Sequence, residues 1–132
     1  KPEKEIRRFQ RIGVRVIASH HDFDATPDDR ILRMLMEQMQ QGGADVAKLA
    51  VMPQNADDVV RLLKLTNDMK QKYPTLPVVT MSMGALGVVS RMAGEIFGSC
   101  ITFGAVGETS APGQIAADKL DDILTVIHQG LC

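Results

Sequence analysis

Residues 44–53, Ala-Asp-Val-Ala-Lys-Leu-Ala-Val-Met-Pro, decide the fold, because they form a strand-like apolar run with one lysine near its centre. Val46, Leu49 and Val51 favour a strand, and Pro53 ends it. Turn-forming residues flank the run on both sides. A run this apolar is typical of a strand that is buried on both faces, so it predicts a parallel sheet.

Lys48 is the unusual residue of this predicted strand. A lysine among buried apolar residues must be paired, extend its amine to solvent, or take part in chemistry. Burial lowers the pKa of a lysine amine, and the neutral amine is a nucleophile. Because lysines are seldom fully buried unless they are paired, position alone favours a structural or solvent-reaching Lys48.

The composition indicates one globular domain and excludes several classes of partner. A chain of 132 residues that is 45% hydrophobic can bury one modest core. A net charge of -1 and an aromatic content of 4% argue against nucleic-acid binding. Without a signal peptide or an apolar run of membrane-spanning length, we expect a cytoplasmic protein with no membrane partner. Cys100 and Cys132 lack metal-ligand spacing and fit a reducing compartment.

Working outward from the lysine strand, the pattern alternates strands with helices. We expect further strands over residues 14–19, 76–83 and 100–103, and a helix after each of the four strands. Thr26 is the expected cap of the first of these helices and Asn55 that of the second. Four strand–helix units predict right-handed crossovers and a parallel sheet. This pattern fits a small doubly wound sheet or half of an eight-fold barrel, since a whole barrel needs about 250 residues.

Polar residues follow the carboxyl ends of the predicted strands, where parallel sheets bind ligands. Each of them also has an ordinary structural interpretation, as a loop residue, a helix cap or a solvated side chain. His20 and His21 are adjacent, so in a strand they point to opposite faces. No third ligand is in register with them, and we therefore expect no metal site. The candidates are His20, His21, Asp22, Lys48, Arg91, Ser110 and Gln114.

Four ordered motifs resemble type I 3-dehydroquinate dehydratase. They are Ser-His-His-Asp-Phe at 19–23, Ala-Lys-Leu-Ala-Val-Met-Pro-Gln at 47–54, Thr-Met-Ser-Met-Gly with Val-Ser-Arg-Met-Ala-Gly-Glu-Ile-Phe-Gly at 80–98, and Thr-Phe-Gly with Ser-Ala-Pro-Gly-Gln-Ile at 102–115. The resemblance covers essentially the whole chain but only the C-terminal half of that family's (β/α)8 TIM barrel. It implies an α/β fold of four βα units with parallel strands, forming one partial barrel domain over residues 1–132.

The resemblance also implies a function. The family is a lyase of the shikimate pathway of aromatic amino-acid biosynthesis, and it converts 3-dehydroquinate to 3-dehydroshikimate without a metal or an organic cofactor. Lys48 matches the lysine that forms a Schiff base with the substrate ketone, and His21 matches the general acid/base. The remaining matches are substrate-binding residues: Arg91 for the carboxylate, Ser110 and Gln114 on a closing loop, and Met81 and Met83 as pocket lining.

The chain begins at Lys1 rather than Met, which together with the partial match suggests a fragment. Half a barrel leaves two sheet edges open, so we expect a homodimer or association with the missing N-terminal half. The isolated chain is expected to keep the lysine pocket but to turn over poorly. Two other functions stay open: a class I aldolase-like Schiff-base enzyme, and a non-catalytic half-barrel.

Overall fold

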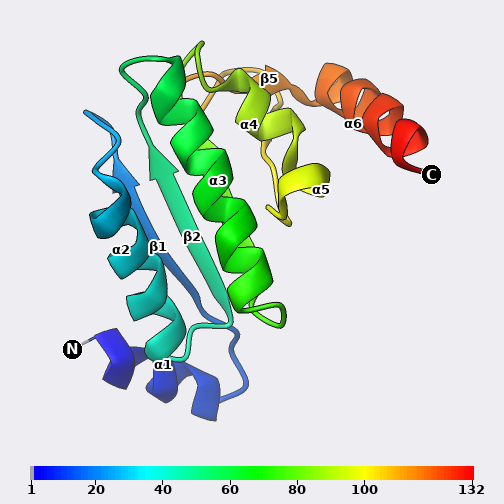
Figure 1. Cartoon of the computed structure of the whole chain (residues 1–132). Helices are drawn as coiled ribbons and strands as arrows, with labels where there is room; N and C mark the ends of the chain where they lie inside the picture. Colours follow the sequence, from blue (N-terminus) through cyan, green and yellow to red (C-terminus); the bar gives the residue numbers. More distant parts are fainter. Residues whose placement is uncertain (1) are drawn as a thin grey trace.

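A three-stranded parallel sheet forms the centre of the molecule. The computed structural model describes residues 2–132. The strands run in the order β1-β2-β3, with bounds Ile17–Asp22, Val46–Val51 and Val78–Ser82 (Figure 1). A helix, α1 (Pro2–Arg11), precedes β1, and helices α2 (Asp29–Gln41) and α3 (Ala56–Lys72) make the two crossovers. The predicted order of parallel strands and helices is therefore confirmed for these units, but the first strand, expected over residues 14–19, begins at Ile17 and includes His20, His21 and Asp22.

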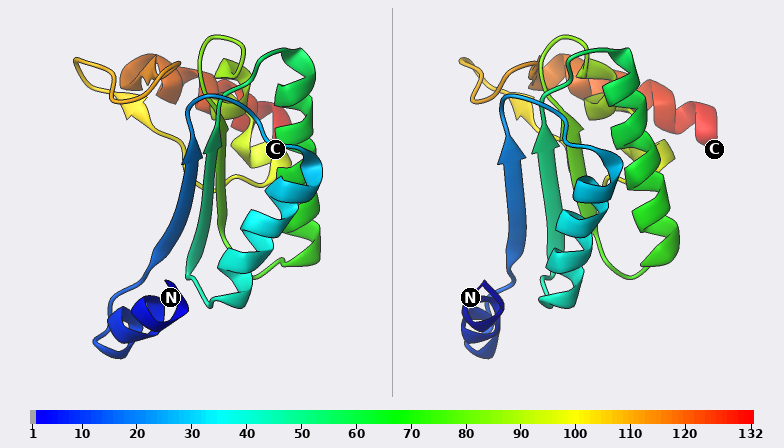
Figure 2. Two further views of the ribbon diagram at one scale, coloured as in Figure 1. Left: turned by 90° about the vertical axis from the view of Figure 1, so that its left-hand side faces the viewer. Right: turned by 60° about the vertical axis from the view of Figure 1, so that its left-hand side comes forward.

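Helices α2 and α3 cover the same face of the sheet (Figure 2). The main core lies between this covered face and the two helices. Its members are Leu32, Met36, Ala47, Leu49, Val51, Leu62, Leu65, Met69 and Val78. A doubly wound sheet carries helices on both of its faces. The one-sided cover therefore differs from that alternative, and it leaves the opposite face, here called the open face, without α2 or α3.

The open face carries its own small apolar cluster, formed by Ala50, Val79, Met81 and Met83. Every residue of β3 is buried, as expected for a strand covered on both sides. In β2, however, Lys48 is only half-buried. Val46, on the same face, is half-buried as well, so the expectation of a strand buried on both faces is wrong for Val46 and Lys48, over which neither α2 nor α3 packs. The half-buried lysine agrees with the expectation of a Lys48 that reaches solvent.

The two predicted helix caps have different outcomes. Asn55 caps α3, since its side-chain oxygen accepts a hydrogen bond from the Asp58 N–H. Helix α2 is capped by Asp28, which accepts from the Ile31 N–H, and so the prediction of a Thr26 cap is wrong. Thr26 is instead buried and donates its hydroxyl to the carbonyl of Met52. A long-range hydrogen bond thus replaces the local one that the sequence suggests.

The predicted fourth strand, residues 100–103, is not a regular strand. Only Ser99 forms a bridge with Val78, and the Ser99 hydroxyl then accepts from the Thr80 N–H. That side-chain bond occupies the next backbone donor of β3, so the ladder stops there. The helix expected after β3 is divided into α4 (Val88–Met92) and α5 (Gly94–Phe97).

The chain then forms a separate two-stranded parallel pair, β4 (Gly104–Ala105) with β5 (Ile115–Ala116), before the last helix, α6 (Ala117–Leu131). Both views in Figure 2 place this pair near the carboxyl ends of β1–β3, away from α2 and α3. Within residues 2–132, every helix is too short or too polar to cross a membrane.

Candidate active site

Strand register brings Lys48 and His21 onto the open face. Lys48 lies opposite Ser19 of β1 and Val79 of β3, and His21 lies opposite Ala50. Alternate residues of a strand share a face, so Lys48 and Ala50 point the same way, and the register places His21 with them. His20 falls on the opposite face, as predicted for adjacent strand residues.

The Lys48 amine lies against an aromatic ring. Its Nζ is 4.7 Å from the ring centroid of Phe103, a distance at which a cation is attracted to the ring face. Phe103 belongs to the segment that follows the Ser99 bridge, so a distant part of the chain covers one side of the amine. Sequence analysis missed this residue as a site candidate, because the resemblance motif Thr-Phe-Gly contains it without signalling its contact.

His21 is exposed and stacks on Phe23, with ring centroids 5.8 Å apart and planes at 12°. Desolvation is the main reason that the pKa of His21 lies below its usual value, and the positive charge of Lys48 lowers it further, followed by that of His20. A depressed pKa favours the neutral ring near neutral pH. The ring can then accept a proton, which suits a general base close to an amine.

Arg91 is almost completely buried, with 2% of its surface exposed. Its Nη2 donates to the carbonyl of Pro112 at 2.9 Å, and its Nη1 makes a long contact of 3.7 Å with the sulfur of Met81. Its Nε is buried without a hydrogen-bond partner, and within residues 2–132 it forms no ion pair with a carboxylate. Burial lowers the pKa of the guanidinium. A buried cation without a counter-charge is costly unless an anion joins it.

The loop around Pro112 is held beside Arg91 by backbone contacts. The Pro112 carbonyl also accepts from the Gly84 N–H at 3.1 Å. Gly113 has φ +81°, and a Cβ there would lie 2.5 Å from the Gly84 carbonyl oxygen. Only glycine allows both the backbone conformation and the close approach. This contact fixes the loop that carries two of the predicted site residues.

Ser110 and Gln114 bond to each other in this loop. The Ser110 N–H donates to the Gln114 side-chain oxygen at 2.8 Å, and the Gln114 amide donates to the Ser110 hydroxyl at 2.9 Å. Ser110 is exposed and Gln114 is half-buried. They are joined to the open face through the loop rather than by contact with Lys48.

The predicted site residues therefore fall into two groups. Lys48, His21, Met81 and Met83 share the open face, and Arg91 contacts this group through the Met81 sulfur. The second group is Ser110 and Gln114, which bond to each other in the loop. A cavity of about 500 Å³ borders Arg91, but it is lined by α5 and its neighbours and does not include Lys48 or His21.

Asp22, the last residue of β1, closes the turn that follows the strand. One side-chain oxygen of Asp22 accepts from the N–H groups of Asp24 and Ala25, each at 3.0 Å. Its interpretation as a turn-closing residue is therefore confirmed. In the described part of the chain, His, Cys, Asp and Glu side chains do not gather in groups of three that could hold a metal ion.

The fold and these side chains define an α/β protein of parallel βα units whose open face presents an amine from the middle of β2 and an imidazole from the carboxyl end of β1, with a buried guanidinium in contact with Met81 of the same face. The family model described as type I 3-dehydroquinase matches residues 1–131. The chain therefore belongs to the type I 3-dehydroquinase family.

Relatives and solved structures agree with this assignment. The chain is 49% identical over 118 residues to the 3-dehydroquinate dehydratase of Clostridium novyi, covering 89% of this chain and 47% of the relative. It is 51% identical over 115 residues to the Klebsiella pneumoniae enzyme, covering 87% of this chain and 46% of that one.

Two crystal structures match nearly the whole chain. The Clostridium difficile type I enzyme, with covalent modified comenic acid, superimposes with a TM-score of 0.91 at 44% identity over 98% of this chain and 51% of its own. The Geobacillus kaustophilus 3-dehydroquinate dehydratase gives a TM-score of 0.92 at 38% identity over 97% and 49%. The chain thus spans about half the length of the proteins that it matches.

Proposed function

We propose that this chain supplies the amine-bearing half of a type I 3-dehydroquinate dehydratase, a hydro-lyase that converts 3-dehydroquinate to 3-dehydroshikimate in the shikimate pathway. The observation that carries the proposal is the shared open face of Lys48 and His21, together with a buried Arg91 that contacts Met81 of that face and forms no ion pair with any carboxylate of residues 2–132. Family membership and the identity to curated dehydratases support it.

Lys48 forms the covalent bond to substrate in this proposal. Its neutral amine attacks the ketone carbon, and the resulting carbinolamine loses water to give a protonated imine. The imine draws electrons from the adjacent carbon, so a C–H proton can leave that carbon. The electron pair then forms the new C=C bond as the β-hydroxyl departs as water. Addition of water to the imine finally releases 3-dehydroshikimate and restores the amine.

His21 moves the protons of these steps. Its lowered pKa, caused first by desolvation and then by Lys48 and His20, leaves the ring neutral and able to accept the C–H proton. Once protonated, the ring can pass the proton to a departing hydroxyl. The proposal needs one histidine in successive acid and base roles, which an imidazole can perform near neutral pH.

The other predicted residues bind substrate. Arg91 is the proposed partner of the substrate carboxylate, because a guanidinium binds both carboxylate oxygens and this one lacks an anion. Met81 and Met83 line the apolar side of the pocket. Ser110 and Gln114 would exchange their mutual hydrogen bonds for substrate hydroxyl and carboxylate groups when the loop closes.

The half-barrel assignment and the oligomeric partner belong to the same proposal. The outer edge of β1 carries no neighbouring strand within residues 2–132, and the chain covers about half of its relatives. We propose that the sheet is half of a (β/α)8 barrel, completed by the missing N-terminal half or by a second copy in a homodimer. We also propose that the protein is cytoplasmic.

A borohydride trap tests the function. The chain is incubated with 3-dehydroquinate, reduced, and analysed by intact mass and peptide mapping. We expect one adduct on Lys48 in the wild type and in Lys64→Ala, whose lysine pairs with Asp68 on α3. Lys48→Ala should give none. His21→Ala should slow turnover while leaving the adduct detectable, because the imine accumulates without its proton carrier.

The alternatives predict different results in the same trap. Adducts with aldol substrates but not with 3-dehydroquinate would indicate an aldolase-like enzyme. No Lys48 adduct, even after the missing half is supplied, would indicate a non-catalytic half-barrel. A steady-state assay of the isolated chain that matches a full-length enzyme would contradict the expectation of poor turnover.

A further inference from the structure

The loop that follows β1, residues 23–28, carries Phe23, which stacks on His21. Phe23 is 56% exposed, so packing does not fix its position. The loop has no regular secondary structure of its own. Contacts that fix the loop therefore also fix the Phe23 ring that stacks on His21.

The loop is tied to the segment that follows β2. The Met52 N–H donates to the Ala25 carbonyl at 3.2 Å, and the Thr26 hydroxyl donates back to the Met52 carbonyl at 2.8 Å. The Gln54 amide donates to the Asp24 carbonyl. These bonds join the loop after β1 to the segment that directly follows β2.

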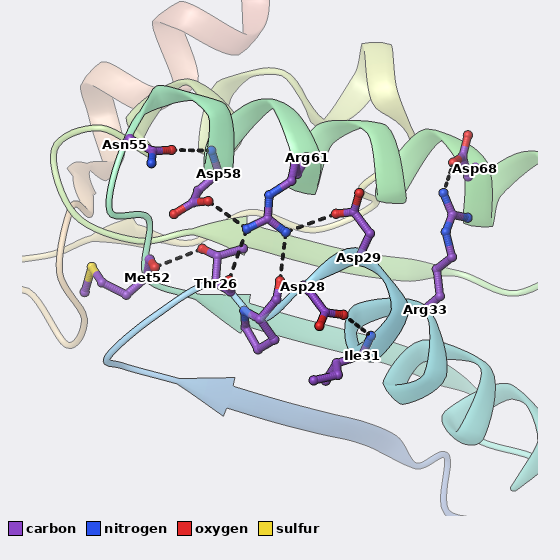
Figure 3. A network of polar contacts seen from close by, with 11 residues as sticks. Thr26, Asp28, Asp29, Ile31, Arg33, Met52, Asn55, Asp58, Arg61 and Asp68 are labelled. Atoms are coloured by element: carbon purple, nitrogen blue, oxygen red, sulfur yellow. Dashed lines mark hydrogen bonds and ion pairs between the residues drawn. The ribbon is translucent and has the colours of Figure 1, made fainter.

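Arg61 of α3 binds the same loop through two of its backbone carbonyls. Its Nη1 donates to the Pro27 carbonyl at 2.8 Å and its Nη2 to the Thr26 carbonyl at 3.1 Å. The same two nitrogens pair with Asp29 at 3.0 Å and Asp58 at 2.7 Å (Figure 3). We call Arg61 with these four oxygen-bearing partners the Arg61 clamp.

The Arg61 clamp joins α2 to α3 and also orients the loop after β1. A guanidinium presents several donors in a fixed planar fork, so it can orient two consecutive carbonyls at once. The Asp58 carboxylate accepts a hydrogen bond from the Gln54 N–H and pairs with the guanidinium, so it fixes Arg61 in turn. The backbone N–H of Asp58 donates to the Asn55 side chain. Helix α3 is thereby connected to the loop after β1 through a continuous series of hydrogen bonds.

We propose that Arg61 is a positioning residue for the dehydratase chemistry: through the Thr26 and Pro27 carbonyls it sets the loop after β1, and so keeps Phe23 stacked on the His21 ring and the ring oriented on the open face. The inference rests on the proposed function of Lys48 and His21. Arg61 itself touches neither of them and acts only through the loop.

The chain contains a matched control for this idea. Arg33 of α2 also pairs with an aspartate of α3, Asp68, at 2.6 Å, but it donates to none of the loop carbonyls (Figure 3). Arg33→Gln and Arg61→Gln both remove a link between α2 and α3. Only Arg61→Gln also removes the hydrogen bonds to the loop carbonyls. An effect seen in Arg61→Gln but not in Arg33→Gln therefore reports the positioning of the loop and not the loss of a contact between α2 and α3.

The experiment measures His21 directly by NMR and measures adduct formation separately. In Arg61→Gln we expect the cross-relaxation between the His21 and Phe23 ring protons to be lost. The pKa of His21 should rise towards its usual value as the ring gains water and leaves the charge of Lys48. Borohydride-trappable adduct with 3-dehydroquinate should form roughly tenfold to a hundredfold more slowly, the scale of a 1 Å misplacement. Arg33→Gln should leave all three unchanged.

Arg61→Lys is the second variant, because it keeps the positive charge but lacks the planar fork that binds the Thr26 and Pro27 carbonyls together. It should change the same three readouts in the same direction, and it replaces Arg61→Gln if that variant does not fold. If the Arg61 variants retain the wild-type ring contacts and His21 titration, the positioning role is overturned. If the NMR signals change but even the wild type gives no adduct, the proposed function fails while the structural coupling stands.

Discussion

Replacing Arg91 with methionine should stabilise the ligand-free chain. Arg91 is 2% exposed and its Nε has no partner, so it keeps a charge in the core at a cost. An unsatisfied buried donor costs about 1–3 kcal/mol, and the desolvation of an ion costs several kcal/mol more. Methionine removes both costs and keeps an unbranched apolar side chain next to Met81.

Arg91→Met removes little stabilising interaction. One charge-assisted hydrogen bond, to the Pro112 carbonyl, contributes about 1.5–3 kcal/mol. That carbonyl remains bonded to the Gly84 N–H after the substitution, so it is not left without a donor. The balance predicts that Arg91→Met raises the free energy of unfolding by about 1–3 kcal/mol.

Urea denaturation followed by circular dichroism measures this change. Arg91→Lys is the control, because it keeps the positive charge and should show no such gain. Added 3-dehydroquinate should stabilise the wild type, by about 2.7 kcal/mol at a hundred times the dissociation constant, and should not stabilise Arg91→Met. A ligand-free Arg91→Met that unfolds more easily than the wild type by over about 1 kcal/mol would refute the reasoning, because Arg91 would then be a stabilising part of the core.

Three further predictions concern the fold. Leu49→Ala should lower the free energy of unfolding by about 2–5 kcal/mol in urea titrations, because Leu49 is fully buried in the main core. Gly113→Ala should destabilise the chain and disorder its loop in amide NMR spectra, since the new Cβ would lie 2.5 Å from the Gly84 carbonyl. Acid should also weaken the fold, because the pKa of Asp58 lies below its usual value. The main cause is the hydrogen bond from the Gln54 N–H, followed by the one from Arg61. That stabilisation is present above about pH 4 and is lost as the pH falls towards the folded-state pKa.

Each of these predictions has a control. Val60→Ala, at a position 61% exposed, should change the free energy of unfolding far less than Leu49→Ala. Gly107→Ala shares a positive φ, +78°, but its Cβ would meet nothing within 4 Å, so any excess cost of Gly113→Ala reports the contact with Gly84. Asp58→Asn should flatten the acid dependence of stability; an unchanged slope would show that this carboxylate does not carry it.

The sequence by itself predicted the parts of the fold that depend on local patterns. The apolar run around Lys48, the helical stripes that follow it and the Asn55 cap all involve residues near one another in the chain. Such patterns predict strands, helices and their order, and the parallel ladder from β1 to β3 follows from that order. The adjacency of His20 and His21 likewise determined that they lie on opposite faces.

Other features required the tertiary structure, because they depend on residues distant in sequence. Thr26 is a residue type that often caps helices, but its hydroxyl donates to the Met52 carbonyl instead, and Asp28 caps α2. The apolar pattern could not predict that α2 and α3 lie on the same face, which leaves Lys48 half-buried, or that Phe103 lies over its amine. Nor could it predict that Arg91 is buried and, among the described residues, pairs with no carboxylate. Local sequence determines which residue types follow each strand, whereas packing between distant segments decides which of them share a face and which charge is left without a partner.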